Sequence, residues 1–293
     1  MTNKLSRRCF LNVCGTSSLL GLSLRMQEIF GQESESLFRN QRFRVGICDW
    51  DLLAAGNPKS FEIAKELGFE GVEISYQPDG KFSLSKQENR KKFLDAAEKT
   101  GVLISSVAMG ILNDRPLATT PEAENWVDDC IAAMTEMNLK HVLLAFFGNG
   151  DIKDKTDSRK IVMEKLKRLA PKAEKQGKIL GIESYLNAAE HLDMLQSIGS
   201  SSVKVYYDEQ NMLTKGYPIY DDLELLLKEK AVCQIHLKEY GARLGEGKVD
   251  FQKIRNLLEQ YDYRGWVVAE SSVKGNWKES QSANAAIMRK IFQ

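Results

Sequence analysis

The sequence predicts a single-domain α/β fold of the (β/α)₈ TIM-barrel class. From residue 42 onward, short runs rich in β-branched residues alternate with longer helical stretches. The chain contains eight such runs, and they start about every thirty residues, which is the size of one βαβ unit. Eight consecutive units of this kind favour a closed barrel. A doubly wound sheet is the alternative, but the G-x-G-x-x-G turn expected after its first strand is missing.

The predicted elements follow this alternation along the chain. The strands are predicted at residues 43–48, 71–75, 102–109, 141–147, 178–184, 203–208, 232–238 and 265–271. The helices are predicted at residues 58–68, 85–101, 121–139, 158–177, 187–199, 220–230, 250–261 and 277–292. Pro58 and Pro121 suit first helical turns. Several glycines suit helix C-termini, namely Gly68, Gly101, Gly177 and Gly199.

Residues 1–32 resemble a twin-arginine export signal, and residues 33–41 are interpreted as a linker to a barrel at 42–293. Arg7 and Arg8 precede Phe10 and Leu11 and then an uncharged, mildly apolar run. That run of about fifteen residues is too short for a typical membrane-spanning helix. We therefore expect the twin-arginine machinery to export the protein to the periplasm or the exterior. The sequence does not define the site at which the signal would be cleaved. A basic N-terminal helix is the alternative interpretation.

The composition is that of an ordinary globular protein. The 293 residues are 43% hydrophobic and 28% charged, which is enough for one large core. Forty-one basic and forty acidic residues give no electrostatic case for nucleic-acid binding. Outside the leader, Cys48, Cys130 and Cys233 are scattered, which predicts small buried side chains rather than a disulfide framework or a Cys-x-x-Cys site.

Polar residues end the last four predicted strands, at the barrel face where chemistry takes place. These residues are Glu183, Asp208, His236 and Glu270. Three carboxylates at one rim would repel each other, and a divalent cation removes that conflict. Oxygen ligands with one imidazole suit Mn²⁺, Co²⁺ or Mg²⁺, with Zn²⁺ as a further option. One such residue alone is more often structural, and His141 and His191 are expected to be structural or solvent-facing. Four equivalent positions, by contrast, predict a metal site.

Strand alternation assigns the two faces of these strands. In residues 232–238 it places Cys233, Ile235 and Leu237 on one face and Gln234, His236 and Lys238 on the other. The residues expected to share the inward face with the candidate ligands are Gly181, Tyr206, Gln234 and Val268. The opposite faces are apolar and are expected to pack under the helices.

The segments GIESYLN, VKVYYDEQNM, QIHLKEY, LGEGKVDF and GWVVAES resemble the xylose isomerase-like barrels called sugar phosphate isomerases/epimerases. The resemblance covers roughly residues 43–292 and implies that Glu183, Asp208, His236 and Glu270 bind one divalent metal. It also implies that Glu183 and Glu270 exchange a substrate proton, as in the ketose 3-epimerase branch. The implied enzyme is a metal-dependent isomerase or epimerase that acts on a keto-sugar or sugar derivative through an enediolate.

Two positions depart from the family pattern and bear on the substrate. Asn211 stands where ketose 3-epimerases commonly have histidine, and Glu239 replaces the aspartate of His-x-Lys-Asp. Xylose isomerase itself and endonuclease IV are disfavoured, because the chain lacks a counterpart of the larger two-metal apparatus and has too few histidines. A metal-dependent keto-sugar lyase or dehydratase stays open, as does a secreted carbohydrate-binding barrel, although binding alone does not require two proton-transfer groups.

Further residues are candidates for substrate contacts. Lys238 is expected either to neutralise developing oxyanion charge or to pair with a rim carboxylate. Glu73 ends strand 2 and could accept hydroxyl hydrogen bonds, while Trp50 could stack on a sugar ring or pack in the core. Asn211 and Arg243 are further candidates for sugar contacts, and Arg243 could equally be solvated. The GEGKVDF segment is interpreted as a glycine turn with Asp250 as helix N-cap, and a homo-oligomer is compatible with the sequence.

Overall fold

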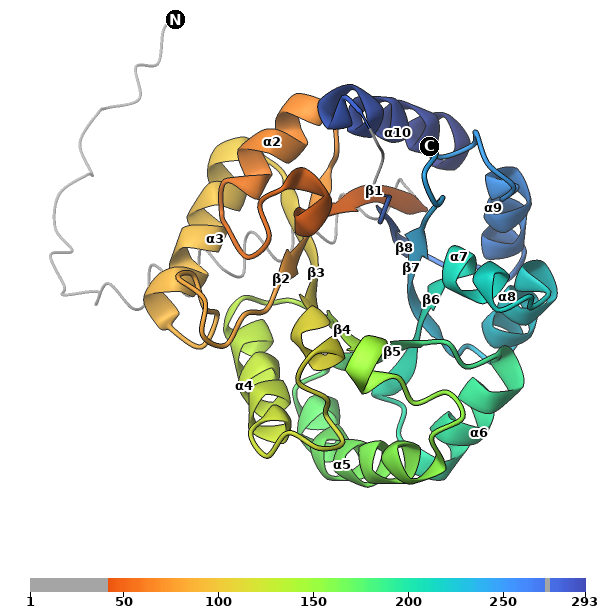
Figure 1. Ribbon diagram of the computed structural model, residues 1–293. Coiled ribbons are helices and arrows are strands. Elements are labelled where there is room, and N and C mark those ends of the chain that lie inside the picture. The colour runs from red at the N-terminus through yellow and green to blue at the C-terminus, as the bar shows by residue number, and fades with distance from the viewer. Residues whose placement is uncertain (1–41, 272–274) are drawn as a thin grey trace, which may run out of the picture. The chain divides into compact units, whose positions relative to one another are not determined.

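The computed structural model describes residues 42–271 and 275–293, which form a closed barrel of parallel strands inside a ring of helices (Figure 1). The strands are β1 (Phe43–Cys48), β2 (Gly71–Ser75), β3 (Leu103–Met109), β4 (His141–Phe146), β5 (Ile179–Ser184), β6 (Val203–Asp208), β7 (Val232–Leu237) and β8 (Gly265–Ala269). Every predicted strand is present, with its ends shifted by two residues at most. The predicted TIM barrel is therefore confirmed, whereas the predicted export signal lies outside the described residues.

Helices follow the strands around the outside of the barrel. They are α2 (Ser60–Leu67), α3 (Gln87–Thr100), α4 (Ala123–Glu136), α5 (Thr156–Lys175), α6 (Ala188–Ile198), α8 (Ile219–Lys228), α9 (Phe251–Gln260) and α10 (Trp277–Phe292). Gly68, Gly101 and Gly199 adopt the left-handed conformation as C-caps, as predicted. Pro58 and Pro121 lie two residues before their helices rather than in the first turn.

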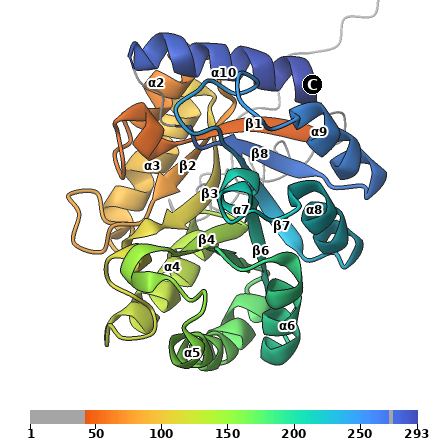
Figure 2. The ribbon, with the colours of Figure 1, turned by 45° about the vertical axis from the view of Figure 1, so that its right-hand side comes forward.

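One short helix was not predicted from the sequence. Helix α7 (Glu209–Thr214) follows β6 directly and contacts α8 and β7 (Figure 2). Its N-cap is Asp208, whose side chain accepts a hydrogen bond from the backbone N–H of Asn211. Three 3-10 helices, η1 (Asp49–Leu52), η2 (Gly110–Asn113) and η3 (Gly148–Gly150), begin the connections after β1, β3 and β4. The turn η1 and helix α7 therefore build part of the rim at the C-terminal ends of the strands.

Two apolar layers hold the barrel together. The larger layer lies between strands and helices and includes Ile182, Val205, Ile235 and Val267, as the alternation predicted. The smaller layer consists of Ala108, Leu143, Ala145, Tyr206 and Cys233. The predicted face of Cys233 is therefore wrong. The β6–β7 register steps from Val205↔Val232 to Tyr206↔Gln234, and this irregularity turns the skipped Cys233 towards Tyr206.

An indole ring fills the barrel towards the N-terminal ends of the strands. A Cβ atom at Gly71 would lie 2.4 Å from the ring of Trp266, so only glycine fits opposite this tryptophan. The Arg44 guanidinium lies 5.7 Å from the same ring, in a cation–π arrangement. With this end occupied by side chains, the opposite end is left for the site.

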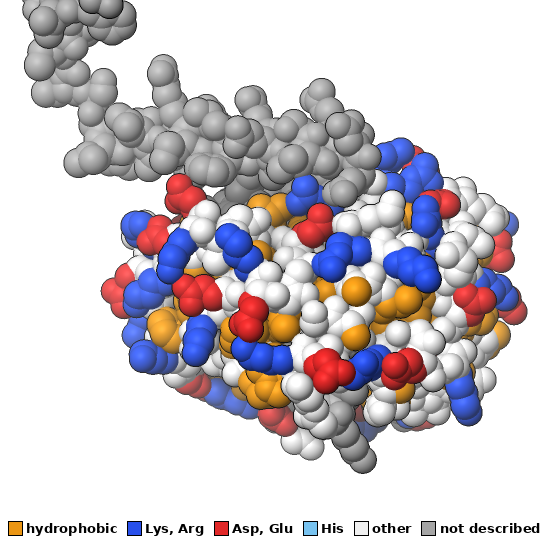
Figure 3. All heavy atoms as spheres, turned by 90° about the horizontal axis from the view of Figure 1, so that it is seen from above, with side chains coloured by type: hydrophobic (Ala, Val, Ile, Leu, Met, Phe, Trp, Pro, Cys, Tyr) orange, Lys and Arg blue, Asp and Glu red, His pale blue; other side chains and the backbone are white. Residues whose placement is uncertain are grey.

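The outer surface carries both signs of charge. Figure 3 shows basic and acidic side chains interspersed on the face seen from above in Figure 1. Lys278 with Glu66, at 3.0 Å, and Lys99 with Glu62, at 2.8 Å, are examples of surface ion pairs. In the described part of the chain, no helix combines the length and the apolar character needed to cross a membrane. Cys48, Cys130 and Cys233 are all buried and unbridged, as predicted.

Candidate active site

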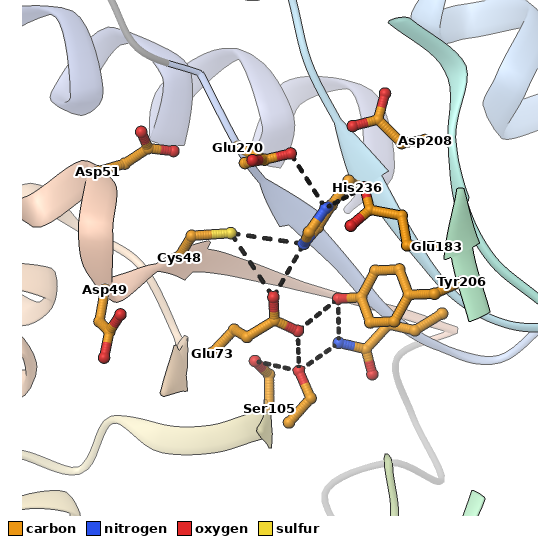
Figure 4. A network of polar contacts seen from close by, with 12 residues as sticks. Cys48, Asp49, Asp51, Glu73, Ser105, Glu183, Tyr206, Asp208, His236 and Glu270 are labelled. Atoms are coloured by element: carbon orange, nitrogen blue, oxygen red, sulfur yellow. Dashed lines mark hydrogen bonds and ion pairs between the residues drawn. The ribbon is translucent and has the colours of Figure 1, made fainter. Parts of the chain in front are cut away.

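Four side chains meet at the C-terminal ends of β5 to β8 (Figure 4). One potential ligand atom from each of them lies within 4.8 Å of all the others: Glu183, Asp208, His236 and Glu270. His236 Nδ1 lies 3.3 Å from a Glu183 oxygen and 3.2 Å from a Glu270 oxygen. The parallel register accounts for the convergence, because Asp208 pairs with His236 and His236 pairs with Val268, two residues before Glu270.

The two oxygens of the Asp208 carboxylate differ: one accepts a hydrogen bond as a helix N-cap, and the other faces the site. Its Oδ1 accepts the Asn211 N–H at 2.8 Å as the N-cap of α7. Its Oδ2 is buried and has no hydrogen-bond partner among the described residues, although the Lys238 ammonium lies 3.5 Å away. Buried carboxylate oxygens normally accept hydrogen bonds, so one that accepts none from the described residues, beside three other potential ligands, fits a cation. The donor set therefore suits a divalent metal.

The four residues carry strongly perturbed charges. Burial raises the pKa of Glu183 and raises the pKa of Asp208 to about 8. Burial also opposes ionisation of Glu270, but the positive charges of His236 and Lys238 outweigh it and hold its pKa below the usual value. These carboxylates remain anionic together only where positive charge compensates them, and a divalent cation would supply that charge.

Lys238 supplies one positive charge to this cluster. Its ammonium lies 2.7 Å from Glu270 Oε2, which is the rim salt bridge expected as one alternative. Burial disfavours the ammonium, but the neighbouring carboxylates, Asp208 first among them, raise the Lys238 pKa. The backbone N–H of Lys238 donates to the buried Glu209 carboxylate at 2.7 Å, which fixes the end of β7. The lysine is therefore held over two of the candidate ligands.

A second group of potential ligands lies below the first and shares His236. Cys48 Sγ and Glu73 Oε1 lie 3.4 Å and 2.9 Å from His236 Nε2. Burial raises the pKa of the Cys48 thiol well above its usual value, so the thiolate that a metal would need is disfavoured. This group is therefore better suited to supporting the imidazole than to binding an ion.

The position of Glu73 does not match its expected role as a sugar contact. The side chain is fully buried, and Oε2 accepts hydrogen bonds from Ser106 at 2.5 Å and Tyr206 at 2.7 Å. Strand β2 continues for two residues beyond Glu73, to Ser75, so the carboxylate lies deeper in the barrel than the four rim residues. Both of its oxygens are occupied by protein groups.

Of the other candidate substrate contacts, Asn211 and Trp50 lie near the ligand cluster, whereas Arg243 points away from it. Asn211 Nδ2 donates to Glu183 Oε1 at 3.2 Å, and the half-buried Trp50 ring lies edge-on to His236 with centroids 6.2 Å apart. Arg243, by contrast, pairs with Glu279 of α10 at 2.8 Å. The expected sugar contact of Arg243 is therefore not supported, because its guanidinium is engaged on the outer helix.

Aromatic residues at the rim were missed from the sequence. Tyr185 and Phe147 pack edge to face at 4.8 Å, and the exposed Tyr240 donates to Asn211 Oδ1 at 3.2 Å. Both tyrosines lie within electrostatic range of Lys238 and Asp208. Their positions in the sequence could have identified the two tyrosines, because Tyr185 and Tyr240 closely follow β5 and β7, in loops at the C-terminal face of the barrel.

Two structural predictions next to the site are confirmed. Asp250 is the N-cap of α9, where its side chain accepts the Lys253 N–H at 3.0 Å. His191 is buried and its Nε2 contacts Ser184 Oγ at 3.0 Å, so it packs behind β5 rather than at the ligand cluster. Glu239, the departure from the family pattern, accepts the Val249 N–H at 3.1 Å and thereby holds the loop that precedes α9.

Comparisons with known proteins agree with this architecture. Residues 61–291 match the family model described as Xylose isomerase-like TIM barrel. The 3-keto-D-glucoside 4-epimerase YcjR from E. coli superposes with a TM-score of 0.70 at 18% identity, over 85% of this chain and 99% of the other. A D-psicose 3-epimerase from Clostridium cellulolyticum gives the same four values. A D-allulose 3-epimerase from Methylomonas sp. gives a TM-score of 0.69 at 15% identity, over 86% and 98%. No curated protein matches the sequence.

Proposed function

Because this chain belongs to the Xylose isomerase-like TIM barrel family, we propose that it is a metal-dependent isomerase or epimerase of a keto-sugar or sugar derivative. One observation carries the proposal: two glutamates at the ends of β5 and β8 flank an aspartate and a histidine within one metal-sized cluster. The structural neighbours whose names describe ketose 3-epimerases and a keto-glucoside 4-epimerase support the same class of reaction.

The four rim residues, Glu183, Asp208, His236 and Glu270, would hold one divalent ion. Oxygen-rich donors with a single imidazole favour Mn²⁺, Co²⁺ or Mg²⁺, with Zn²⁺ as a further option. When bound, the ion would act as a Lewis acid that makes the C–H next to a substrate carbonyl more acidic. The Oδ2 of Asp208, which has no hydrogen-bond partner among the described residues, is the clearest sign of a ligand position.

Glu183 and Glu270 would move the proton. They come from the two outer strands of the four, so they can approach a bound sugar from opposite sides. One glutamate removes a proton to give an enediolate, and the other returns a proton. Return to the same carbon from the opposite face gives an epimer, and return to the neighbouring carbon gives an isomer. Each acid–base role is typically worth roughly 10²–10⁴-fold in rate.

The surrounding residues would bind and orient the sugar. Lys238, beside Glu270, would stabilise negative charge on a substrate oxygen, and Asn211 would hold Glu183 in position. Trp50, Tyr185 and Tyr240 would offer aromatic surface to the apolar face of a sugar ring. None of these residues holds the ion in this proposal.

The test uses metal-loaded protein in deuterated water with free ketoses and 3-keto-glycosides. We expect deuterium at one substrate carbon and a product with the same molecular formula as the substrate, either an epimer or an isomer. A product that has lost water or an alcohol would instead identify a lyase, and binding without exchange or product would identify a carbohydrate-binding barrel. Either of those results would overturn the proposal.

We also propose that residues 1–32 direct export through the twin-arginine machinery. The motive is the Arg7–Arg8 pair ahead of Phe10, Leu11 and an uncharged run. A fusion of residues 1–40 to a folded reporter should leave the cytoplasm. The same fusion with Arg7→Lys and Arg8→Lys should stay inside. Cytoplasmic retention of the unchanged fusion would refute the signal.

A further inference from the structure

The residue that follows Glu270 is held by side chains from two other elements. Strand β8 ends one residue before Glu270, whose N–H donates to Leu237 O at 3.0 Å. The next residue, Ser271, is fully buried, so its N–H and C=O need partners from outside the sheet. We propose that two side chains, Asp51 and Gln281, clamp Ser271 and thereby act as positioning residues for Glu270. We take Glu270 as a metal ligand from the proposed function, and only this step rests on it.

The clamp, as we call Asp51 and Gln281, has one arm on each side of Ser271. Asp51, in η1, accepts the Ser271 N–H at 2.8 Å through Oδ2. Gln281, in α10, donates from Nε2 to the Ser271 carbonyl at 2.7 Å. The Ser271 hydroxyl lies 3.3 Å from the carbonyl oxygen of Glu239, at the start of the loop after β7. Helix α10 packs against β1 (Figure 1), so groups from the β1 side, the β7 side and the outer helix all meet at this residue.

A second amide of α10 fixes the orientation of Gln281. Asn284 Nδ2 lies 3.0 Å from Gln281 Oε1, and Asn284 Oδ1 lies 2.9 Å from the Leu244 nitrogen. A backbone N–H can only donate and a backbone carbonyl can only accept. The Leu244 N–H therefore needs the Asn284 oxygen, and the Ser271 carbonyl needs the Gln281 nitrogen. Flipping either amide places two donors or two acceptors face to face. This row of hydrogen bonds therefore has one direction, and none of its members titrates.

The clamp acts where the position of a carboxylate matters most. Glu270 Oε2 lies 2.7 Å from Lys238 Nζ and 3.2 Å from His236 Nδ1. A group that binds an ion and moves a proton has to be held within about 0.5 Å of its productive position. The clamp adds two bonds at Ser271 to the one that Glu270 makes with the sheet. Both of its side chains are buried, and burial of polar groups is tolerated when their hydrogen bonds are made.

The Gln281→Met variant opens one arm of the clamp with little change in side-chain volume. The Ser271 carbonyl loses its donor, so the backbone that carries Glu270 is held less firmly. Loss of an outer partner of a metal site typically costs roughly 10–100-fold in metal affinity. We expect about a tenfold loss for Zn²⁺, measured by competition with a chelator in the absence of sugar. The visible absorption of the Co²⁺-loaded protein should also change, because it depends on how the ligands are arranged.

Asn284→Leu is the matched control. Each of the two variants removes two hydrogen bonds from α10 and leaves one buried backbone group without its partner. In Asn284→Leu that group is the Leu244 N–H, and the contact of Gln281 with Ser271 is kept. We expect Zn²⁺ affinity within about threefold of the wild type and an unchanged Co²⁺ spectrum. Denaturant titrations should show similar losses of stability in both variants, so a purely structural role of these amides would weaken Zn²⁺ binding equally.

If Gln281→Met does not fold, Asp51→Ala opens the other arm by removing the acceptor of the Ser271 N–H. It should also weaken Zn²⁺ binding about tenfold. Wild-type affinity in the clamp variant, or an equal loss in Asn284→Leu, would overturn the inference. A wild-type protein that binds no Zn²⁺ would refute the proposed metal site, and the clamp with it. Sugar turnover is measured separately, so failure of the proposed reaction would not be mistaken for failure of the clamp.

Discussion

Strands β5–β8 and strands β1–β3 enclose the same barrel interior, but they bring polar groups to it at different depths. In β5–β8 each candidate ligand lies at the strand end or one residue from it: Glu183, Asp208, His236 and Glu270. In β2 the carboxylate of Glu73 lies two residues before the end, and it meets Ser106 of β3 below the rim. Both regions therefore contribute a glutamate to the barrel interior, but only β5–β8 place theirs at the rim.

The depth of a carboxylate decides which partners it finds. Glu73 is fully buried and both of its oxygens contact protein groups. Asp208, at the rim, keeps one oxygen without a hydrogen-bond partner among the described residues. A shift of one strand residue moves a side chain to the other face, and a shift of two moves it by roughly 6–7 Å along the strand. The four rim residues therefore keep donor atoms that suit an ion, while Glu73 contacts the same histidine from deeper in the barrel.

The largest effect is expected for His236→Ala. This change removes the imidazole at the centre of the rim cluster, so purified protein should lose nearly all bound metal by elemental analysis while the fold remains. The matched control is His141→Ala, since His141 begins β4 at the opposite end of the barrel. Full metal occupancy in His236→Ala would contradict the assignment of the four rim residues as the metal ligands.

The sequence predicted the fold and the rim cluster because both depend on local patterns. Strand positions followed from apolar runs, and the four ligands followed from polar residues at strand ends. Cys233 was placed on the wrong face because alternation holds only until the register shifts, and the shift at Val205–Tyr206 depends on pairing between strands. Helix α7 was missed because it spans only six residues after Asp208.

The roles of Glu73 and Arg243 could not be read from the sequence for a different reason. The sequence places Glu73 near the end of β2, but the distance to the rim depends on how neighbouring strands are staggered. Arg243 lies in a loop, and a long flexible side chain can reach either the site or a helix; it pairs with Glu279. The buried contacts of Glu73 were likewise hidden, because Ser106, Tyr206 and His236 come from β3, β6 and β7 and meet Glu73 only in three dimensions.

The next largest effect concerns the two rim glutamates. Glutamine keeps an oxygen for the ion but is a poor base, so Glu183→Gln and Glu270→Gln should each slow deuterium exchange by roughly 10²-fold or more. Metal affinity should change less than turnover. Glu190→Gln, in the capping box of α6 and outside the cluster, is the control. If both rim variants exchange at the wild-type rate, the metal site survives but the two-glutamate mechanism does not.

A smaller effect is expected at the aromatic rim. Tyr185→Ala and Tyr240→Ala remove ring surface near the site without touching a candidate ligand, so KM for the sugar should rise about 2- to 10-fold, with a smaller change in kcat. Steady-state kinetics on metal-loaded protein would measure this difference. Tyr261→Ala, whose hydroxyl contacts Glu224 on the outer helices, should leave KM unchanged. Equal KM values in all three variants would remove these tyrosines from the substrate site.

The smallest effect on the site is expected for Asp49→Asn, at the beginning of η1. Burial raises the pKa of Asp49 to about 7, although its oxygens accept hydrogen bonds from Ser75 and the Gly56 N–H. Because this folded pKa lies above the unfolded value of about 3.9, ionisation favours the unfolded state, and stability from this group is lost as the pH rises from about 4 to 7. Asparagine cannot ionise, so the variant does not lose this stability. Its free energy of unfolding, relative to that of the wild type, should therefore rise by about 1–3 kcal/mol between pH 5 and pH 8. Denaturant titrations at both pH values measure the gain, and Zn²⁺ affinity should stay within about twofold, because Asp49 contacts none of the rim ligands. A parallel pH dependence in the two proteins would show that Asp49 is already ionised at pH 5. A large loss of Zn²⁺ affinity would show that Asp49, at the start of the η1 turn, contributes to the metal site after all.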